Sequence, residues 1–251
     1  MKNILYVTGA GVSVESGIPT FRGEDGLWTI GSVNYTPQEM ATRRMYLNCP
    51  GEFLLWYYQR FASYRHIQPN SIHQWLSDKN LITQNIDGLD GKAGNNTYIP
   101  IHGRLDKVTV LHEQGKSVPL IDAPWEFVAE QCQNINDDDF VKTQLLDAFK
   151  ISTKTLVPEF EYSLKPFVLL FDEFYTDLYR MNEAEILMKS ADKFVFIGTS
   201  FSVNITFIAL HEALKRGCDI DIVDPKPVDL NIGDANYYAM TAQEYISVMP
   251  N

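Results

Sequence analysis

Short apolar runs bounded by turn residues recur along the chain, and segments with helical periodicity lie between several of them. Each run has the length of a strand buried in a parallel sheet. Apolar residues at helical spacing predict helices at 182–189 and 207–215, and Gly217 is well placed to end the second helix. The runs predicted as strands are 4–7, 81–83, 167–171, 194–197 and 220–223.

Strands that alternate with helices predict an α/β fold with a doubly wound parallel sheet. Ligands of such sheets bind beyond the carboxyl ends of the strands. Two long segments, 23–70 and 104–165, interrupt the alternation and predict a smaller module inserted into the main domain. The acidic run 137–139 predicts the N-terminal cap of a helix over 140–150, because carboxylates favour that end of a helix.

Composition excludes several function classes for this chain of 251 residues. The formal net charge of -11 argues against a broad electrostatic grip on nucleic acid. No apolar run is long enough to span a bilayer, and no secretory signal is visible after Met1. The three cysteines are far apart and odd in number, which predicts a reduced, cytoplasmic setting without a disulfide framework.

Glycines and small polar residues follow the first predicted strand. Gly9, Ala10 and Gly11 allow backbone N–H groups to approach a ligand closely, and Ser13 lies where a helix could open toward it. The third glycine of the usual dinucleotide fingerprint is missing. By itself, this pattern predicts either a phosphate site or a tight strand–helix turn without a ligand.

The longer string Gly-Ala-Gly-x-Ser-x-x-Ser-Gly-Ile-Pro-x-Phe-Arg, at 9–22, resembles the opening motif of the sirtuins, which are NAD-dependent protein deacylases. Three further stretches resemble the same family in the same order: 83–89 with Ala93-Gly94, then His102-Gly103, then 198–200. The resemblance extends to Asp224. It implies one catalytic domain over 1–251, with a Rossmann-like NAD-binding part and a smaller inserted module.

The resemblance also implies roles for individual residues. His102 would be the base for a ribose hydroxyl, since imidazole titrates near ~6.5, and Asn85 would position the ribose or a water. The alternatives are a structural histidine after a strand, and an Asx-turn of Asp87 with Gly88. The implied NAD-binding residues are Gly9, Ala10, Gly11, Ser13, Phe21, Arg22, Gln84, Asp87, Gly198, Thr199, Ser200 and Asp224.

On the substrate side, Tyr57 and Arg60 resemble the Tyr-x-x-Arg pair of sirtuins that remove succinyl and malonyl groups. Three residues apart on a helix, the two side chains share a face and fit a carboxylate. The alternative is an aromatic core stripe with a solvent-facing Arg60. Val168 and Phe171 would pair with the substrate backbone by strand addition. Asp172 stands where the family has glycine and could crowd the peptide.

Most sirtuins hold a structural zinc with two Cys-x-x-Cys pairs. Here the expected positions, Val110 with Glu113 and the stretch 158–166, contain no cysteine, and Cys132 alone cannot build a tetrahedral thiolate site. The sequence therefore predicts no structural zinc. Apolar packing would replace the metal, through Trp125, Phe127, Val128 and Phe149.

The predicted function is NAD-dependent deacylation of an acylated lysine in a protein or peptide, with release of nicotinamide and O-acyl-ADP-ribose. The acyl group would be acetyl, or succinyl and malonyl if Tyr57 and Arg60 bind a carboxylate. One alternative is a sirtuin-like NAD hydrolase, which the missing zinc ligands and Asp172 favour. Another is a catalytically idle NAD sensor, which the joint presence of Asn85, Asp87 and His102 disfavours. The oligomeric state stays open.

Overall fold

The computed structural model describes residues 2–20, 35–133 and 137–249. The chain divides into two compact units, and each draws on separate stretches of sequence. The first unit comprises Met1–Thr20, Ile67–Ile101 and Arg180–Asn251, and the second comprises Phe21–His66 and His102–Tyr179. The prediction of a single catalytic domain stays a prediction.

The first unit is built on a parallel sheet of six strands in the order β3-β2-β1-β7-β8-β9, as predicted. Apolar side chains fill β1 and β7, which lie at its centre and are buried on both faces. The strands are β1 (Ile4–Thr8), β2 (Asn80–Thr83), β3 (Ile99–Pro100), β7 (Lys193–Ile197), β8 (Asp219–Asp224) and β9 (Ala235–Ala239).

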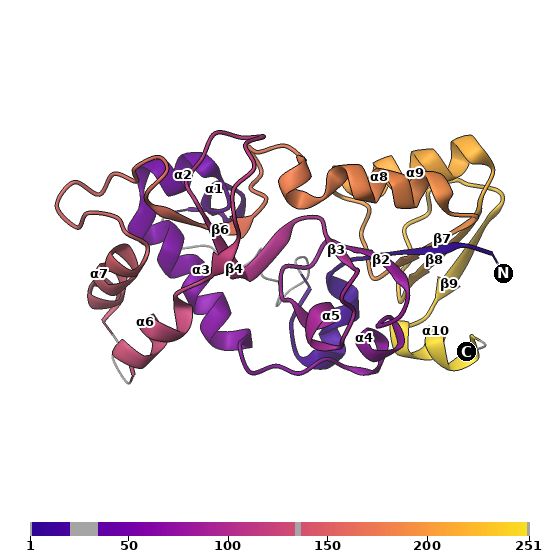
Figure 1. Cartoon of the computed structure of the whole chain (residues 1–251). Helices are drawn as coiled ribbons and strands as arrows, with labels where there is room; N and C mark the ends of the chain where they lie inside the picture. The colour runs from indigo at the N-terminus through magenta and orange to yellow at the C-terminus, as the bar shows by residue number, and fades with distance from the viewer. Residues whose placement is uncertain (1, 21–34, 134–136, 250–251) are drawn as a thin grey trace. The chain divides into compact units, whose positions relative to one another are not determined.

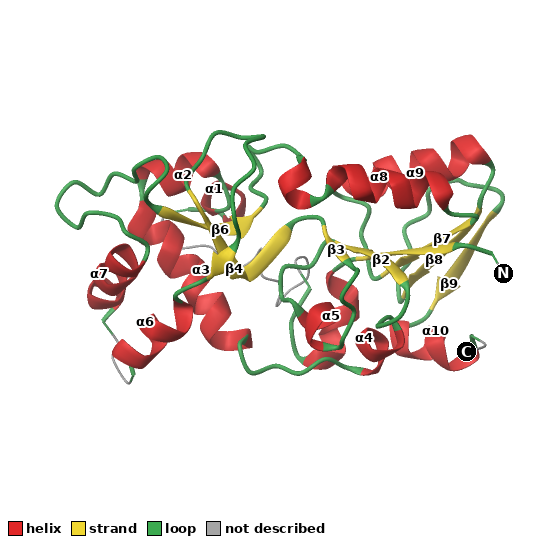
Figure 2. Cartoon of the chain, viewed as in Figure 1, coloured by secondary structure: helices red, strands yellow, loops and turns green. Residues whose placement is uncertain are grey.

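Helices cover both faces of this sheet (Figures 1 and 2). The predicted helices at 182–189 and 207–215 are confirmed as α8 and α9, which lie on one face. Gly217 ends α9 in the left-handed conformation, with φ 65°. The helices of the first unit are α4 (Ser71–Trp75), α5 (Leu89–Lys92), α8 (Met181–Ser190), α9 (Asn204–Arg216) and α10 (Ala242–Val248).

The segment after β1 forms a 3₁₀ helix, Ala10–Ser16, and not the helix expected to open at Ser13. Gly17 ends it in the left-handed conformation, with φ 91°. Val12 turns inward from this short helix and packs with Ile72, Leu76 and Ile197 in the core of the unit. Packing of Val12 therefore holds the glycine segment against the sheet.

The second unit contains a three-stranded antiparallel sheet in the order β5-β4-β6 and a group of helices. The aromatic side chains of α3 pack toward α6 and α7. Its elements are α1 (Pro37–Met40), α2 (Arg43–Asn48), α3 (Pro50–Tyr64), β4 (Gly103–Val110), β5 (Ile121–Asp122), α6 (Trp125–Gln131), α7 (Asp138–Ala148), β6 (Leu164–Val168) and a 3₁₀ turn, Asp177–Tyr179.

The run 167–171 was expected as a strand of the parallel sheet, and that expectation is wrong. β6 ends at Val168 and pairs antiparallel with β4. Beyond it the Leu169 amide donates to the His102 carbonyl, next to the start of β4, and the Phe171 amide donates to the Ala41 carbonyl. An apolar run indicates burial, but it does not say which sheet buries it. Asp137 is confirmed as the cap of α7, which begins at Asp138.

Trp125 anchors the helical part of the second unit. Its ring lies 4.6 Å from that of Phe149, and its Nε1 donates to the Leu105 carbonyl at 2.7 Å. Val128 is also buried, one helical turn later. Phe127 is 52% exposed, so its predicted place in this packing is wrong. Two residues after Trp125, it points away from the face that Trp125 and Val128 share.

Among the described residues, no group of three or more His, Cys, Asp or Glu side chains is arranged to hold a metal ion. The predicted absence of zinc stays a prediction. The helices in the described ranges also lack the length and apolar character required to cross a membrane.

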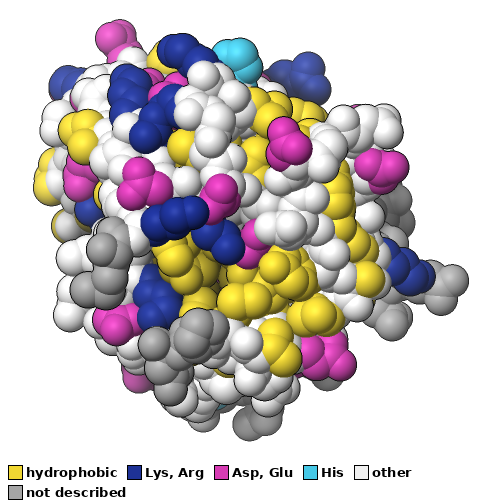
Figure 3. Space-filling model, turned by 90° about the vertical axis from the view of Figure 1, so that its right-hand side faces the viewer, with side chains coloured by type: hydrophobic (Ala, Val, Ile, Leu, Met, Phe, Trp, Pro, Cys, Tyr) yellow, Lys and Arg dark blue, Asp and Glu magenta, His cyan; other side chains and the backbone are white. Residues whose placement is uncertain are grey.

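The face shown in Figure 3 carries an area of hydrophobic side chains bordered by charged ones. In the first unit, β9 is the last strand of the sheet, and three of its five residues are exposed. Tyr237 lies on this strand and is 36% exposed. Much of the surface of a folded protein is apolar, so this area does not by itself mark a binding site.

Candidate functional site

The strand order of the first unit reverses between β1 and β7, which is where ligands bind in doubly wound sheets. The turns after these two strands, at Gly9–Gly11 and Gly198, pack backbone against backbone. A Cβ on Gly11 would lie 2.5 Å from the Gly198 Cα, and a Cβ on Gly9 would lie 2.7 Å from the Gly198 carbonyl oxygen. Gly198 also has φ 62°. Glycine is therefore required at all three positions.

The N–H groups of all three glycines are used within the protein, and that of Gly198 donates to the Val223 carbonyl at 2.9 Å. Gly9 donates to the Ile197 carbonyl at 3.1 Å, and Gly11 donates to the Gly198 carbonyl at 3.0 Å. The expectation that small residues expose these amides to a phosphate is therefore corrected for Gly9 and Gly11. Glycine is needed at these positions because a Cβ would prevent the close approach of the two turns.

Ser13 is the centre of a buried polar cluster in the same unit. Its hydroxyl donates to the Asp87 carboxylate at 2.7 Å and accepts from the Asn85 amide at 3.1 Å. His73 Nε2 lies 3.5 Å from the same hydroxyl, and His73 is fully buried. Burial lowers the pKa of His73, and Asp87 opposes this shift.

Asp87 also accepts from the Leu89 amide at 2.9 Å, which forms the local turn considered as an alternative role. Both of its oxygens therefore already have one protein partner. A carboxylate has about four acceptor positions, so this turn leaves capacity for a further donor. The turn and a role in ligand binding are compatible.

Asn85 has one unsatisfied polar atom. Its side-chain nitrogen donates to Ser13 and to the Gly9 carbonyl, each at 3.1 Å. Its Oδ1 is buried and has no hydrogen-bond partner among the described residues. A buried acceptor without a partner carries a desolvation penalty of about 1–3 kcal/mol, which a donor on a ligand or water would relieve. Asn85 thus presents an acceptor beside the reversal of strand order.

The remaining predicted NAD-binding residues of this unit also follow strands. Gln84 Nε2 donates to the Thr8 carbonyl at 3.0 Å and to the Thr199 hydroxyl at 3.1 Å, which links the ends of β2, β1 and β7. Ser200 is exposed and lies 2.8 Å from the Ser202 hydroxyl. Asp224 ends β8, and partial burial raises the pKa of its carboxyl. Phe21 and Arg22 lie outside the described residues.

Asp90 is a buried carboxyl that sequence reasoning did not single out. It is 1% exposed, and its Oδ1 has no partner in the part of the chain that the structure describes. Burial, assisted by the nearby Asp87, raises the pKa of Asp90 to about 7, although a hydrogen bond with Thr83 opposes the shift. Its position one turn after Asp87 was visible in the sequence, but its burial was not.

In the second unit, His102 lies immediately before β4. Its Nε2 is 2.9 Å from the Tyr175 hydroxyl, and the two rings stack at 24° with centroids 5.9 Å apart. Gly103 has φ 85°, and a Cβ there would lie 2.0 Å from the Phe167 carbonyl oxygen. The glycine after His102 is thus required for β4 to approach β6. Tyr175 was not among the predicted residues, and no motif marks it.

Tyr57 and Arg60 lie on α3 of the second unit, one turn apart. Tyr57 is 2% exposed and packs against Phe53 and Trp56, as in the alternative of an aromatic core stripe. The Arg60 guanidinium lies 3.4 Å from the centroid of the Trp56 ring and is half-buried, so the solvent-facing alternative does not describe it. Burial lowers the pKa of Arg60 to about 10, which leaves it cationic at neutral pH.

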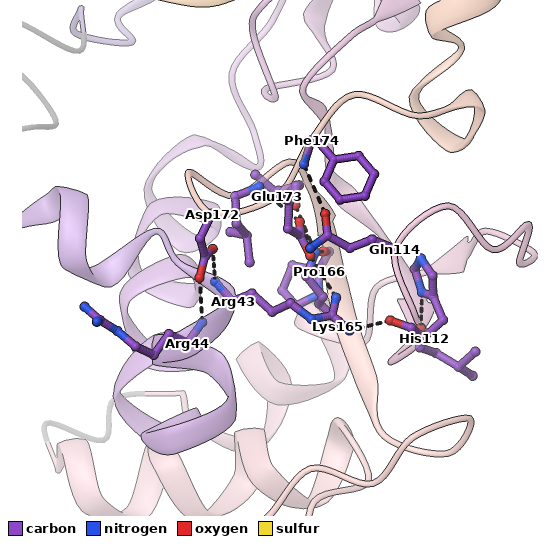
Figure 4. A network of polar contacts seen from close by, with 12 residues as sticks. Arg43, Arg44, His112, Gln114, Lys165, Pro166, Asp172, Glu173 and Phe174 are labelled. Carbon is purple, nitrogen blue, oxygen red and sulfur yellow. Dashed lines mark hydrogen bonds and ion pairs between the residues drawn. The ribbon is translucent and has the colours of Figure 1, made fainter.

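The loop after β6 is held by an ionic network (Figure 4). Glu173 binds Lys165 at 3.0 Å and Arg43 at 2.9 Å, and the side chains of Lys165 and Glu173 are 2% and 5% exposed. Burial lowers the pKa of Lys165, and Glu173 opposes this shift. Asp172 accepts from the amides of Arg43 and Arg44 at 2.6 and 3.0 Å. Its carboxylate is therefore directed at the start of α2.

The two residues predicted to pair with a substrate backbone differ in their surroundings. Val168 is buried and pairs with Gly103 across β4 and β6. Phe171 lies beyond the strand, and its side chain is 55% exposed. β6 is the last strand of its sheet among the described residues, so its outer edge suits the expected strand addition at Val168 better than at Phe171.

Comparisons with known proteins agree with this architecture. A family model described as Sir2 family matches residues 9–205. An NAD-dependent protein deacylase of Bacteroides thetaiotaomicron is 31% identical over 236 residues, which cover 91% of this chain and 88% of the relative. NAD-dependent protein deacylase 1 of Caldanaerobacter subterraneus subsp. tengcongensis is 33% identical over 253 residues, with coverages of 96% and 90%.

Solved structures give the same result. The crystal structure of a Sir2 homologue in complex with NAD is 28% identical, with a TM-score of 0.72, and the match covers 98% of this chain and 87% of that one. A second structure, described as concerning the mechanism and regulation of Sir2 enzymes, is 29% identical with a TM-score of 0.70 and coverages of 97% and 89%.

Proposed function

Because the chain belongs to the Sir2 family, we propose that it removes acyl groups from lysine side chains with NAD as co-substrate, and that His102 and Asn85 are its catalytic residues. Relatives that match most of the chain are named NAD-dependent protein deacylases, and a structural neighbour binds NAD. The observation that carries the assignment of residues is the buried Asn85 Oδ1. It lacks a partner among the described residues and lies beside the reversal of strand order.

In the proposed reaction, the bond between nicotinamide and ribose breaks and the acyl oxygen of the lysine substrate attacks the ribose carbon. Nicotinamide leaves, and after water is added the acyl group remains on ADP-ribose while the lysine is released. Asn85 Oδ1 accepts a hydrogen bond from a ribose hydroxyl or a water, which supplies the partner that this oxygen lacks in the structure. His102 takes the proton of a ribose hydroxyl, a suitable role for an imidazole at neutral pH.

The first unit supplies the remaining NAD contacts in this proposal. Asp87 keeps acceptor capacity for the amide of nicotinamide, and Ser13 holds the Asp87 carboxylate in place. Ala10 and Ser200 carry donors for phosphate, whereas Gly9, Gly11 and Gly198 contribute by letting the two turns meet. Gln84 and Thr199 fix each other, and Asp224 can accept from a ribose hydroxyl. By the family resemblance, Phe21 would shield the reacting ribose and Arg22 would contact the phosphates, although both lie outside the described residues.

The Ala substitutions His102→Ala and Asn85→Ala test these assignments. We expect nicotinamide release to fall by at least about a hundredfold in His102→Ala, since general-base catalysis contributes about 10²–10⁴-fold. Asn85→Ala should also lower it strongly, because it removes the acceptor proposed to position the ribose or a water. The melting temperature should change little for His102→Ala, because its side chain is only partly buried. The exposed His211 on α9 gives the matched control, His211→Ala. Turnover near that of the control in both variants would refute the assignment.

For the acyl group, we propose that Arg60 favours chains ending in a carboxylate. Its half-buried guanidinium is cationic and stacks on Trp56, which orients it on α3. Arg60→Met should lower turnover of succinyl-lysine peptides by about tenfold or more and leave acetyl-lysine peptides nearly unchanged. Arg65→Met, at the end of the same helix, is the matched control. Equal losses on both peptides would exclude the carboxylate contact.

The second candidate function is NAD hydrolysis without an acyl substrate, which the same Asn85 and His102 would support. Asp172 no longer favours it specifically, because capping α2 gives this carboxylate a structural role. Nicotinamide release with and without acyl-lysine peptides, followed by mass spectrometry, separates the two. Release that requires a peptide and yields acylated ADP-ribose identifies the deacylase, whereas equal release without peptide identifies the hydrolase.

A further inference from the structure

We infer that Tyr175 is a positioning residue for His102: its hydroxyl and ring fix the orientation of the imidazole and support its protonated form. This inference rests on the proposed role of His102 as a base. The two residues are separated by 73 positions in sequence, but both belong to the second unit.

Two independent contacts join the side chains. The Tyr175 hydroxyl lies 2.9 Å from His102 Nε2, a normal hydrogen-bond length. The rings also stack, at an angle of 24° and a centroid distance of 5.9 Å. The hydrogen bond sets the direction of the Cε1–Nε2 edge, and the stacking limits rotation of the ring out of its plane. Together they restrict both side-chain torsions of His102.

Tyr175 can do this because the loop that carries it is anchored on three sides (Figure 4). The Asp172 carboxylate accepts from two amides of α2, and the Glu173 carboxylate is buried with Lys165 and Arg43. The Phe174 amide donates to Gln114 Oε1 at 3.1 Å. The three residues before Tyr175 are thus each tied to another element. A hydroxyl delivered by such a loop has a defined position.

The chemistry of the pair follows from the proton count of imidazole. The neutral ring has one donor and one acceptor nitrogen, and a tyrosine hydroxyl can match either at Nε2. After His102 takes a proton, both nitrogens are donors, and Nε2–H donates to the Tyr175 oxygen. Hydrogen bonds to charged groups are stronger than neutral ones, so the contact favours the protonated ring that forms during proton transfer.

The test compares Tyr175→Phe, which keeps the stacked ring and removes the hydroxyl, with the exposed control Tyr162→Phe of the same unit. We expect kcat for peptide-dependent nicotinamide release to fall by roughly tenfold in Tyr175→Phe, while KM for NAD changes by less than about twofold. Tyr162→Phe should match the wild type. The His102 ring ¹⁵N signals, assigned with His102→Gln, should shift in Tyr175→Phe and not in Tyr162→Phe.

A wild-type kcat in folded Tyr175→Phe, whatever its ¹⁵N signals, would overturn the inference. If that variant does not fold, the wild-type spectrum decides: a His102 Nε2 signal displaced from that of a solvent-exposed histidine supports the inference, and a signal at the solvent-exposed value overturns it. Activity retained in His102→Ala would refute the proposed function itself. Loss of activity in His102→Ala together with a wild-type Tyr175→Phe would refute the positioning role alone.

Discussion

Replacing the buried carboxyl of Asp90 should make the protein's stability less dependent on pH. Asp90 is 1% exposed, and burial raises its pKa from 3.8 to about 7. Between these values the folded protein holds a proton that the unfolded chain has released. The stability associated with this group is therefore complete below pH 3.8 and is lost progressively as pH rises to about 7.

A shift of about three pH units corresponds to about 4 kcal/mol over the whole range, of which about 2.5 kcal/mol falls between pH 5 and pH 8. Asp90→Asn has a similar shape and no titration. Urea unfolding followed by circular dichroism between pH 5 and pH 8 should show the wild type losing about 2.5 kcal/mol more than this variant. The exposed Asp147 provides the control, Asp147→Asn, which should follow the wild type.

Parallel stability curves for the wild type and Asp90→Asn would refute this reasoning. They would mean that Asp90 is already ionised in the folded protein at pH 5. Its carboxylate would then have hydrogen-bond donors that the structure does not show for the buried Oδ1. A variant that is less stable than the wild type by the same amount at every pH would instead report a packing or hydrogen-bond defect. Only a difference in slope supports the raised pKa.

Three further substitutions test the buried ion pair, the close approach of the two glycine turns and the contact of Asp172 with α2. Glu173→Gln breaks the buried pair with Lys165 and should cost about 3–5 kcal/mol in urea unfolding, whereas Glu185→Gln, in an exposed pair, should cost under about 1 kcal/mol; similar costs would contradict the network. Gly198→Ala should destabilise clearly more than Gly115→Ala, because only the former Cβ meets backbone, at 2.7 Å; equal melting temperatures would contradict this. Asp172→Ala should lower the free energy of unfolding by about 1 kcal/mol, because it removes hydrogen bonds to the amides of α2. An unchanged free energy of unfolding would mean that these hydrogen bonds do not stabilise the protein.

Local patterns in the sequence were sufficient for much of the first unit. Apolar runs at 4–7, 194–197 and 220–223 predicted buried strands because burial on both faces requires continuous apolar residues. Gly217 and Asp137 marked helix ends because their conformational and hydrogen-bonding preferences are local. These inferences depend on neighbours within a few positions.

The run 167–171 and Phe127 show where such inference fails. The first was assigned to the parallel sheet, yet Val168 ends a strand of the antiparallel one. Hydrophobicity reports that a residue prefers burial, and several partners can satisfy that preference equally well. The choice between them depends on pairings with distant segments, which no short window contains.

The sequence alone determined the family resemblance, the alternation of strands and helices, and the identities of Asn85, Asp87 and His102 as candidates for chemistry. Only the tertiary structure decided that the turns at Gly9, Gly11 and Gly198 pack backbone against backbone. It also decided that Asn85 Oδ1 is buried without a partner among the described residues and that Tyr175 contacts His102. The physical reason is that a residue's type fixes which bonds it can make. Its partners and its exposure to water depend on segments brought close by folding.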